Sequence, residues 1–283
     1  MRSQLDLPVL EWDDLTEFEL PFGRDQFDPD ISFDCGQAFR WRRFEEGWVG
    51  TIDEAVAFVY RRDDLLMARL FNGDSGIINR YLRADFDLGL WADASADALL
   101  RLTVRRYAGL RVMAQPKVET ILTFACSGAN SVGRIANSME RMTELLGHPI
   151  AIISGVTYRA FPDAKAVAAA PEDILRYDCA MAYRARCVGD IARALVDGLA
   201  EELPAIRRMR YEDARTRLAS HKWIGPKIAD CICLMALGFD CAVPVDTHVW
   251  RLSQTLFGVK IPTKTLTANT YSTVSFLFRN RFG

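Results

Sequence analysis

The sequence predicts an α+β fold that is mostly α, with an N-terminal antiparallel β domain followed by helical domains. Between residues 39 and 70, short runs rich in aromatic and β-branched residues alternate with turn-like polar residues, which is typical of strands. From residue 94 onward, apolar residues recur with helical spacing. We therefore expect a sheet domain in residues 1–100 and a helical domain in residues 101–283.

The individual elements follow from these patterns in chain order. Residues 1–30 are acidic, contain three prolines and are expected to be irregular. Strands are predicted at residues 39–42, 48–52, 55–60 and 65–70. Helices are predicted at residues 77–82, 94–110, 116–126, 132–146, 163–199 and 266–278, with a break at 127–131.

The most informative stretch, residues 220–249, is predicted to form a turn, a buried helix, a short loop and the start of a second helix. Gly225 suits a turn or helix start, and Pro226 fits the first helical position, where its missing N–H costs nothing. Gly238 can end this apolar helix. After an extended segment, Asp246 occupies the N-cap position of the next helix.

Lys227 falls in the first turn of this helix, where the helix dipole and apolar neighbours both disfavour its charged form. A neutral, nucleophilic amine is therefore more accessible. Cys231 lies four residues on and shares a helix face with Lys227, and the hairpin return brings the Asp246 carboxylate nearby. Taken alone, a helix lysine is usually solvated, and an aspartate at a helix start is usually only a cap.

Residues 225–237, Gly-Pro-Lys-Ile-Ala-Asp-Cys-Ile-Cys-Leu-Met-Ala-Leu, and residues 243–248, Val-Pro-Val-Asp-Thr-His, resemble the helix-hairpin-helix–Gly/Pro/Asp motif. Among proteins with this motif, the chain is most similar to the 8-oxoguanine DNA glycosylase/AP lyases. The resemblance extends from about residue 33 to the C-terminus and places the helix-hairpin-helix at about residues 213–237.

This resemblance implies that Lys227 is the catalytic nucleophile and Asp246 its essential partner. The implied substrate is damaged double-stranded DNA. The implied activity is excision of 8-oxoguanine opposite cytosine through a lysine Schiff base, followed by strand cleavage, in base excision repair.

The same resemblance implies a base pocket made of Gly36, Cys231, Met235, Ser272 and Phe276. Residues 34–41 resemble the family's pocket segment, in which the glycine carbonyl accepts the N7–H of the oxidised purine. Guanine has a lone pair at N7, so one carbonyl attracts the lesion and repels the normal base. Phe276 would stack on the flipped ring, and Ser272 replaces the glutamine that reads its Watson–Crick edge. Cys231 would lie against the base as a charge partner of Lys227.

The DNA-binding residues that the resemblance implies are Asn130, Arg134, Tyr183, Arg184, Gly225 and His248. Arg134 and Arg184 would read the orphaned cytosine, and Tyr183 would wedge beside it, as base extrusion requires. Gly225 and His248 would meet phosphates, and carbonyls of the hairpin would hold a monovalent cation. Besides Ser272, two positions depart from the family pattern: Ala129 stands where a plug side chain belongs, and Trp223 replaces the first glycine of the hairpin.

The formal net charge of −2 conceals an uneven distribution. Residues 1–100 contain 10 Lys and Arg against 21 Asp and Glu, whereas residues 101–283 contain 25 against 16. Seven of the basic residues lie between 207 and 227: Arg207, Arg208, Arg210, Arg215, Arg217, Lys222 and Lys227. Such a run seen alone is more often a solvated, salt-bridged helix. Beside a helix-hairpin-helix we expect it to face phosphates.

Composition bounds the remaining properties. The seven cysteines are odd in number and scattered, which indicates free thiols in a reducing compartment. No metal site is predicted, and the implied chemistry requires no cofactor. No apolar run approaches the length of a membrane span, and the N-terminus resembles neither a secretory signal nor a transit peptide. We expect an intracellular monomer that acts on DNA, is not secreted and has no membrane partner.

Two alternatives remain open. Ala129 and Ser272 alter the plug and the base reader, so a glycosylase of the same fold for another damaged base is one alternative. Monofunctional alkyl-base glycosylases lack the lysine, which argues against that group. A non-catalytic helix-hairpin-helix DNA-binding protein is the other alternative, and the joint presence of Lys227 and Asp246 argues against it.

Overall fold

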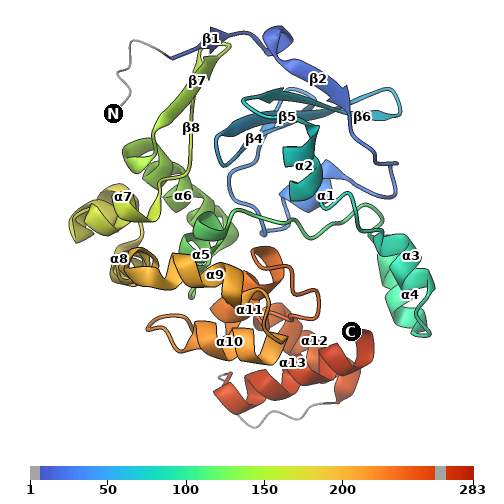
Figure 1. The fold of residues 1–283 in the computed structure, drawn as a ribbon. Coiled ribbons are helices and arrows are strands. Elements are labelled where there is room, and N and C mark those ends of the chain that lie inside the picture. The colour runs from blue at the N-terminus through green and yellow to red at the C-terminus, as the bar shows by residue number, and fades with distance from the viewer. Residues whose placement is uncertain (1–6, 259–265) are drawn as a thin grey trace.

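The computed structural model describes residues 7–258 and 266–283, and Figure 1 shows a β-rich part above a helical part. The predicted class, α+β and mostly α, is confirmed. Residues 1–6, on which the expectation about secretory signals and transit peptides partly rests, lie outside the described residues. Within the two described ranges, no helix is long and apolar enough to cross a membrane.

The larger sheet has five antiparallel strands in the order β2-β6-β5-β4-β3. Their bounds are β2 (Thr16–Glu19), β3 (Arg42–Phe44), β4 (Gly47–Ile52), β5 (Ala55–Arg62) and β6 (Leu65–Phe71). The strands predicted at 48–52, 55–60 and 65–70 are confirmed. The strand predicted at 39–42 is wrong, because Trp41 turns into the core, where it stacks on Phe33 with ring centroids 4.0 Å apart. The strand begins only at Arg42.

The prediction that residues 1–30 are irregular is also wrong. They contain β1 (Val9–Leu10), the 3-10 helix η2 (Trp12–Asp14), β2 and the start of α1 (Pro29–Phe33). Asp13 and Glu17 of this segment bind arginines from strands far away in the sequence, which no local pattern reveals.

A second, three-stranded sheet has the order β1-β7-β8. Strand β1 pairs in parallel with β7 (Pro149–Ile153), which pairs antiparallel with β8 (Val156–Arg159). Buried Ile150 and Tyr158 of this hairpin pack in one cluster with Trp12 and Phe58. The hairpin therefore packs on the N-terminal sheet although it lies beyond residue 100. The predicted domain boundary at residue 100 stays a prediction.

The helices account for most of the rest of the fold, and each predicted helical region contains helix. They are α2 (Ser75–Tyr81), α3 (Leu88–Asp93), α4 (Ala98–Arg106), α5 (Lys117–Ala125), α6 (Val132–Leu146), α7 (Ala164–Ala169), the π-helix η3 (Ile174–Asp178), the 3-10 helix η4 (Ala182–Arg184), α8 (Ala185–Ala194), the π-helix η5 (Leu195–Leu199), α9 (Ala200–Ile206), α10 (Tyr211–Ala219), α11 (Pro226–Met235), α12 (Thr247–Phe257) and α13 (Ala268–Phe282).

Helix α11 is the centre of the helical part. It begins at Pro226 as predicted, packs against α5 and α10, and is followed by Gly238 with a left-handed φ of +74°. Its Ile232 is fully buried in a cluster shared with α5 and α6. Burying such a side chain contributes roughly 1.5–3 kcal/mol to folding stability. The buried face of α11 therefore fixes the helix in the core, while its first turn stays accessible.

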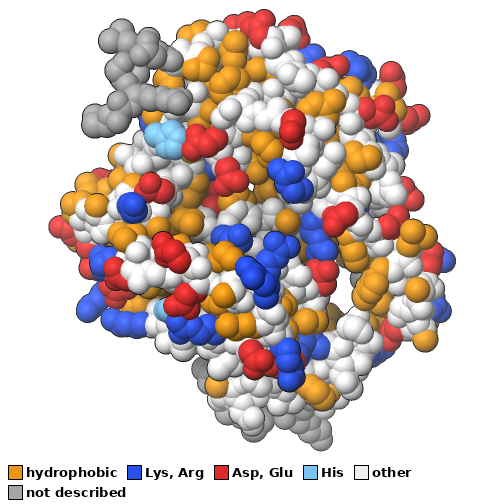
Figure 2. Space-filling model, viewed as in Figure 1, with side chains coloured by type: hydrophobic (Ala, Val, Ile, Leu, Met, Phe, Trp, Pro, Cys, Tyr) orange, Lys and Arg blue, Asp and Glu red, His pale blue; other side chains and the backbone are white. Residues whose placement is uncertain are grey.

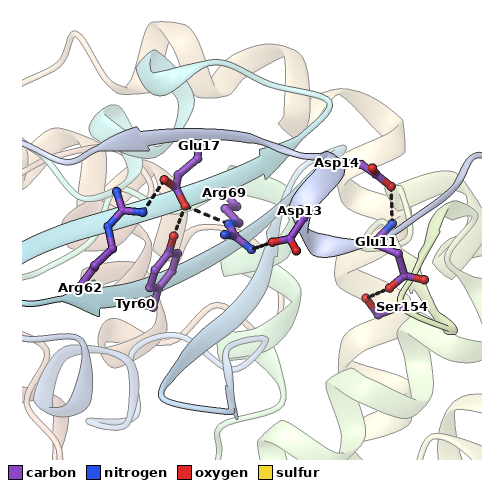
Figure 3. Close-up of polar contacts among 8 residues, drawn as sticks. All are labelled: Glu11, Asp13, Asp14, Glu17, Tyr60, Arg62, Arg69 and Ser154. Atoms are coloured by element: carbon purple, nitrogen blue, oxygen red, sulfur yellow. Dashed lines mark hydrogen bonds and ion pairs between the residues drawn. The ribbon is translucent and has the colours of Figure 1, made fainter.

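The acidic strand β2 is fixed to the sheet by Glu17 (Figure 3). Its carboxylate accepts hydrogen bonds from Tyr60, from Arg62 Nη1 at 2.8 Å and from Arg69 Nε at 3.1 Å. The Tyr60 hydroxyl above all, and then the two guanidinium groups, lower the pKa of Glu17 to about 2. The edge strand is therefore held by a charged network as well as by its backbone ladder.

We predict that Glu17→Gln destabilises the protein by about 1–2 kcal/mol at pH 7, since the side chain is partly exposed and solvent screens the pairs. A pKa lowered in the folded state contributes stability that is present above the ordinary pKa and is lost as the pH falls toward the folded value. Urea unfolding should show the difference from wild type narrowing as the pH falls from 4.5 toward 2.

Glu19→Gln provides the matched control. Glu19 lies exposed on the same strand and has no side-chain hydrogen bond within residues 7–258 and 266–283. An equal loss in both variants, or a loss at Glu17 that does not change with pH, would contradict the prediction.

Candidate active site

Lys227 lies in the first turn of α11, half-buried, as the sequence predicts. Its Nζ donates to the Ser127 hydroxyl at 3.0 Å and lies 5.7 Å from the centre of the Phe124 ring. Ser127 in turn donates to the Phe124 carbonyl at 2.7 Å, so its oxygen is oriented to accept from the amine. The end of α5 thus holds the amine at the helix N-terminus.

Asp246 is the N-cap of α12, which confirms the predicted position. Its Oδ1 accepts from the backbone N–H of His248 at 2.9 Å and of Val249 at 2.8 Å. Both capping bonds end on one carboxylate oxygen, so the cap does not use the other. The helix dipole also favours a negative charge at this end of α12.

Cys231 lies one turn along α11 from Lys227 and is buried. Burial raises the pKa of its thiol to about 12, against the lowering effect of Lys227, while Asp230 and Asp246 raise it further. Ser127 is the hydrogen-bond partner of the Lys227 amine, and the role of Cys231 as a charge partner stays a prediction.

Gly36 lies in a turn of the N-terminal part that packs closely against the start of α6. Its φ of +82° is left-handed, and a Cβ there would lie 2.8 Å from Cγ2 of Val132, the first residue of α6. Only glycine combines that backbone with that approach. The following side chain, Gln37, is buried; its Nε2 donates to the carbonyl of Arg111 at 2.6 Å, and its Oε1 accepts from the N–H of Met113 at 3.0 Å.

Met235 ends α11, two turns beyond Lys227, and is half-buried. Its carbonyl accepts from the N–H of Gln115 at 2.7 Å, and the Gln115 side chain donates to the carbonyl of Gln37 at 2.8 Å. The glycine turn and α11 are therefore joined through one buried glutamine.

Ser272 and Phe276 lie one turn apart on α13 and share its exposed face. The Phe276 ring is 55% exposed, whereas Tyr271 and Val274 on the opposite face are buried. A large aromatic side chain left in water on an otherwise well-packed helix is suited to stacking on a ligand.

The predicted plug turn and the Tyr183–Arg184 pair lie together. Tyr183 donates to the carbonyl of Gly128 at 3.1 Å, and Arg184 donates to the same carbonyl at 2.7 Å and to that of Ala129 at 2.5 Å. Ala129 has a left-handed φ of +46°. Asn130 donates to the Cys126 carbonyl at 3.1 Å, so in this structure its side chain supports the turn itself.

The three remaining DNA-binding candidates are placed by helix starts. Arg134 lies exposed in the first turn of α6, His248 lies exposed in the first turn of α12, and Gly225 is the N-cap of α11. The three helices, α6, α11 and α12, all belong to the helical part (Figure 1).

Trp223 explains how the hairpin tolerates the loss of a glycine. Its φ of +74° is the left-handed conformation that a glycine would adopt easily. The indole Nε1 donates to Asp190 of α8 at 2.7 Å, and the Lys222 amine lies 3.2 Å from the same carboxylate oxygen. Together with Arg193, these donors lower the pKa of Asp190 to about 2, with the Trp223 bond contributing most. The hairpin is thereby fastened to α8.

Two arginines of the basic run at 207–227 are engaged within the protein, and the expectation that the run faces phosphates stays a prediction. Arg215 points inward, with Nε 3.1 Å from the fully buried Asp230, and Arg217 binds Glu202 at 2.7 Å. Figure 2 shows basic side chains in several groups over the helical part and acidic ones along the top edge of the sheet.

Comparison with known proteins agrees with this arrangement. Residues 122–274 match the model of the HhH-GPD superfamily of base excision DNA repair proteins. The chain belongs to this superfamily, as its hairpin, its lysine and its capping aspartate indicate. Residues 19–121 match the N-terminal domain of 8-oxoguanine DNA glycosylase, which confirms the particular member that the sequence resembles.

Similar proteins include an N-glycosylase/DNA lyase of Saccharomyces cerevisiae, 30% identical over 78% of this chain, and the N-glycosylase/DNA lyase OGG1 of Arabidopsis thaliana, 27% identical over 89%. The matched regions span 65% and 72% of the lengths of those proteins. A Clostridium acetobutylicum 8-oxoguanine glycosylase/lyase, solved with DNA containing cytosine opposite 8-oxoG, is 25% identical, with a TM-score of 0.80. That match covers 95% of this chain and 92% of the other.

The sequence alone did not identify several residues that shape the site. Ser127, Gln37 and Gln115 are buried polar residues whose partners lie 70 or more residues away in the chain. The one local signal was the position of Ser127 directly after an apolar helix, which marks a helix end but not a partner.

We predict that Gly36→Ala destabilises the protein by about 1–2 kcal/mol through the left-handed backbone alone, with the Val132 contact adding to it. Thermal or urea unfolding measures the change. Gly133→Ala, in α6 beside Val132, is the control, because a Cβ there meets nothing within 4 Å and alanine favours helix. Equal stability of the two variants would contradict the prediction.

Proposed function

We propose that this protein is a bifunctional DNA glycosylase and AP lyase that excises 8-oxoguanine opposite cytosine from duplex DNA. The observation that carries the proposal is the joint presence of a half-buried Lys227 amine, held by Ser127 at the start of α11, and an Asp246 carboxylate fixed as the N-cap of α12. The names of the yeast and Arabidopsis relatives and the C. acetobutylicum complex support it.

The lysine amine performs the covalent step. Neutral Nζ of Lys227 attacks C1′ of the extruded nucleotide, and the bond between C1′ and the base breaks, its electron pair leaving with the base, which is then protonated. Loss of protons from the nitrogen and opening of the sugar ring give an imine between Nζ and C1′. The imine acidifies C2′, and loss of that proton expels the 3′ phosphate and cleaves the strand.

Asp246 stabilises the positive charge that develops on the sugar as the base leaves. Its two cap bonds fix the carboxylate before the reaction, so little reorganisation is needed in the transition state. The hydrogen bond to Ser127 holds the lysine amine without placing a full negative charge on it.

Base recognition falls to the two sides of the site. Gly36, held against α6, would present its carbonyl to N7–H of the oxidised base, while the exposed Phe276 ring would stack on the base. The base must first leave the duplex, and the turn at 128–129 with Tyr183 and Arg184 would occupy the gap. Met235, Ser272 and Cys231 would line the remaining pocket.

The proposed partners and conditions follow from this chemistry. The protein acts as a monomer on damaged double-stranded DNA, in the cellular compartment that contains the DNA. Imine formation at the sugar uses the Lys227 amine and the Asp246 carboxylate and requires no metal or organic cofactor. Trp223 has a left-handed backbone, which a glycine adopts easily, and this supports a 221–225 turn whose carbonyls hold a monovalent cation. Such a cation would add positive charge beside a phosphate.

We predict that Lys227→Gln abolishes base release and strand cleavage while the fold is retained. Borohydride trapping on a duplex with one 8-oxoguanine opposite cytosine should give a covalent adduct with wild type and none with the variant. Lys222→Gln, an exposed lysine on the same hairpin, is the control and should still trap. Full activity of Lys227→Gln would refute the assignment of the nucleophile.

A second candidate, a glycosylase for another damaged base, rests on Ala129 and Ser272 at the plug and reader positions. The same experiment separates the two candidates. Adducts with an abasic duplex but not with 8-oxoguanine would indicate an intact lyase with a different lesion preference. Adducts with neither would favour the non-catalytic DNA-binding alternative.

We predict that Asp246→Asn keeps the cap, because asparagine caps helices about as well as aspartate, and leaves stability within about 0.5 kcal/mol. The single-turnover rate of base excision should fall about 100-fold, since the charge that stabilises the sugar cation is removed. Unfolding and rate measurements on the same sample test this, and an unchanged rate would leave Asp246 with a structural role only.

A further inference from the structure

A buried carboxylate lies on the same helix as Lys227. Asp230, three residues after Lys227 on α11, has no exposed surface. Its Oδ1 accepts from the hydroxyl of Tyr211 at 2.7 Å and its Oδ2 from the hydroxyl of Tyr271 at 2.6 Å. Arg215 adds an ion pair at 3.1 Å. A buried charge is tolerated only with such partners, so this cluster has one well-defined arrangement.

The partners of Asp230 come from two other helices. Tyr211 and Arg215 belong to α10, and Tyr271 belongs to α13. Figure 1 shows α10, α11, α12 and α13 gathered at the bottom of the molecule. The carboxylate therefore connects the helix that carries the nucleophile with the helix that carries Ser272 and Phe276.

Tyr271 extends the network to the catalytic aspartate. Its hydroxyl oxygen accepts the backbone N–H of Val245 at 3.1 Å while it donates to Asp230. Val245 is buried and directly precedes Asp246. It packs with Tyr271 and Val274 in one hydrophobic cluster. One phenol hydroxyl thus fixes the backbone from which the Asp246 carboxylate projects.

We propose that Tyr271 is a positioning residue that sets the place of Asp246 relative to Lys227, and with it the orientation of the base-stacking face of α13. This inference rests on the proposed glycosylase function. Without the hydroxyl, the buried N–H of Val245 loses its acceptor, and the return between α11 and α12 relaxes. Displacement of a reacting group by about 1 Å can slow a reaction roughly 100-fold.

Tyr211 supplies a matched control within the same network. Tyr211→Phe and Tyr271→Phe each remove one hydroxyl bond to Asp230 and keep a buried ring, with 6% and 4% exposure. Only Tyr271→Phe also breaks the link to Val245. A purely structural role would reduce stability in both variants and leave the chemistry similar.

The test compares single-turnover excision, binding and unfolding of both variants on an 8-oxoguanine:cytosine duplex. We expect Tyr271→Phe to lower the rate at saturating enzyme about 10-fold or more, with the dissociation constant for the duplex within about 2-fold of wild type. Tyr211→Phe should stay within about 3-fold in both quantities. Strand cleavage of a preformed abasic site should follow the same order, because that step also needs Lys227 and Asp246.

Equal rates for the two variants, or a wild-type rate for Tyr271→Phe, would overturn the inference. So would a defect confined to DNA affinity. Absence of excision and of trapping by the wild-type protein would instead refute the proposed function, so failure of the inference and failure of the function give different results.

Discussion

The site depends on two groups at the starts of consecutive helices, the Lys227 amine on α11 and the Asp246 carboxylate on α12, which form no ion pair with each other in the described structure. Each group is satisfied elsewhere in the described chain: Lys227 donates to Ser127, and Asp246 accepts from the first amides of its own helix. A direct ion pair would keep the amine protonated and occupy the carboxylate. The separation is maintained by backbone, through the short return from α11 to α12, and the buried Asp230–Tyr271 bond lies beneath that return.

The two halves of the molecule meet at this point through polar side chains that face no solvent. Gln37 fixes the turn that contains Gly36, and Gln115 joins that turn to the end of α11. Because buried polar groups are satisfied only in one geometry, these contacts define the relative position of the two halves more narrowly than apolar packing does.

Much of this could be read from the sequence, and the exceptions share a physical cause. The Pro226 helix start, the Gly238 stop and the Asp246 cap are local, so the residues themselves specify them. Ser127 contacts Lys227 across 100 positions, and Tyr271 reaches Asp230 across 41. Strand β2 was not predicted because acidic residues are typical of an irregular segment, and the partners of Glu17, Arg62 and Arg69, lie on strands far away in the sequence. Trp223 gave no sign of its left-handed backbone, which Asp190 of another helix helps to hold.

The pairing of Val9 with Ile152 has a consequence for how the protein is made. Strand β1 has no partner in this sheet until the chain has been synthesised as far as β7. The large antiparallel sheet, whose strands follow one another closely, can form first, since short-range contacts close at little entropic cost. Completion of the small sheet then joins two segments that are far apart in the chain, so we expect it to follow formation of the large sheet.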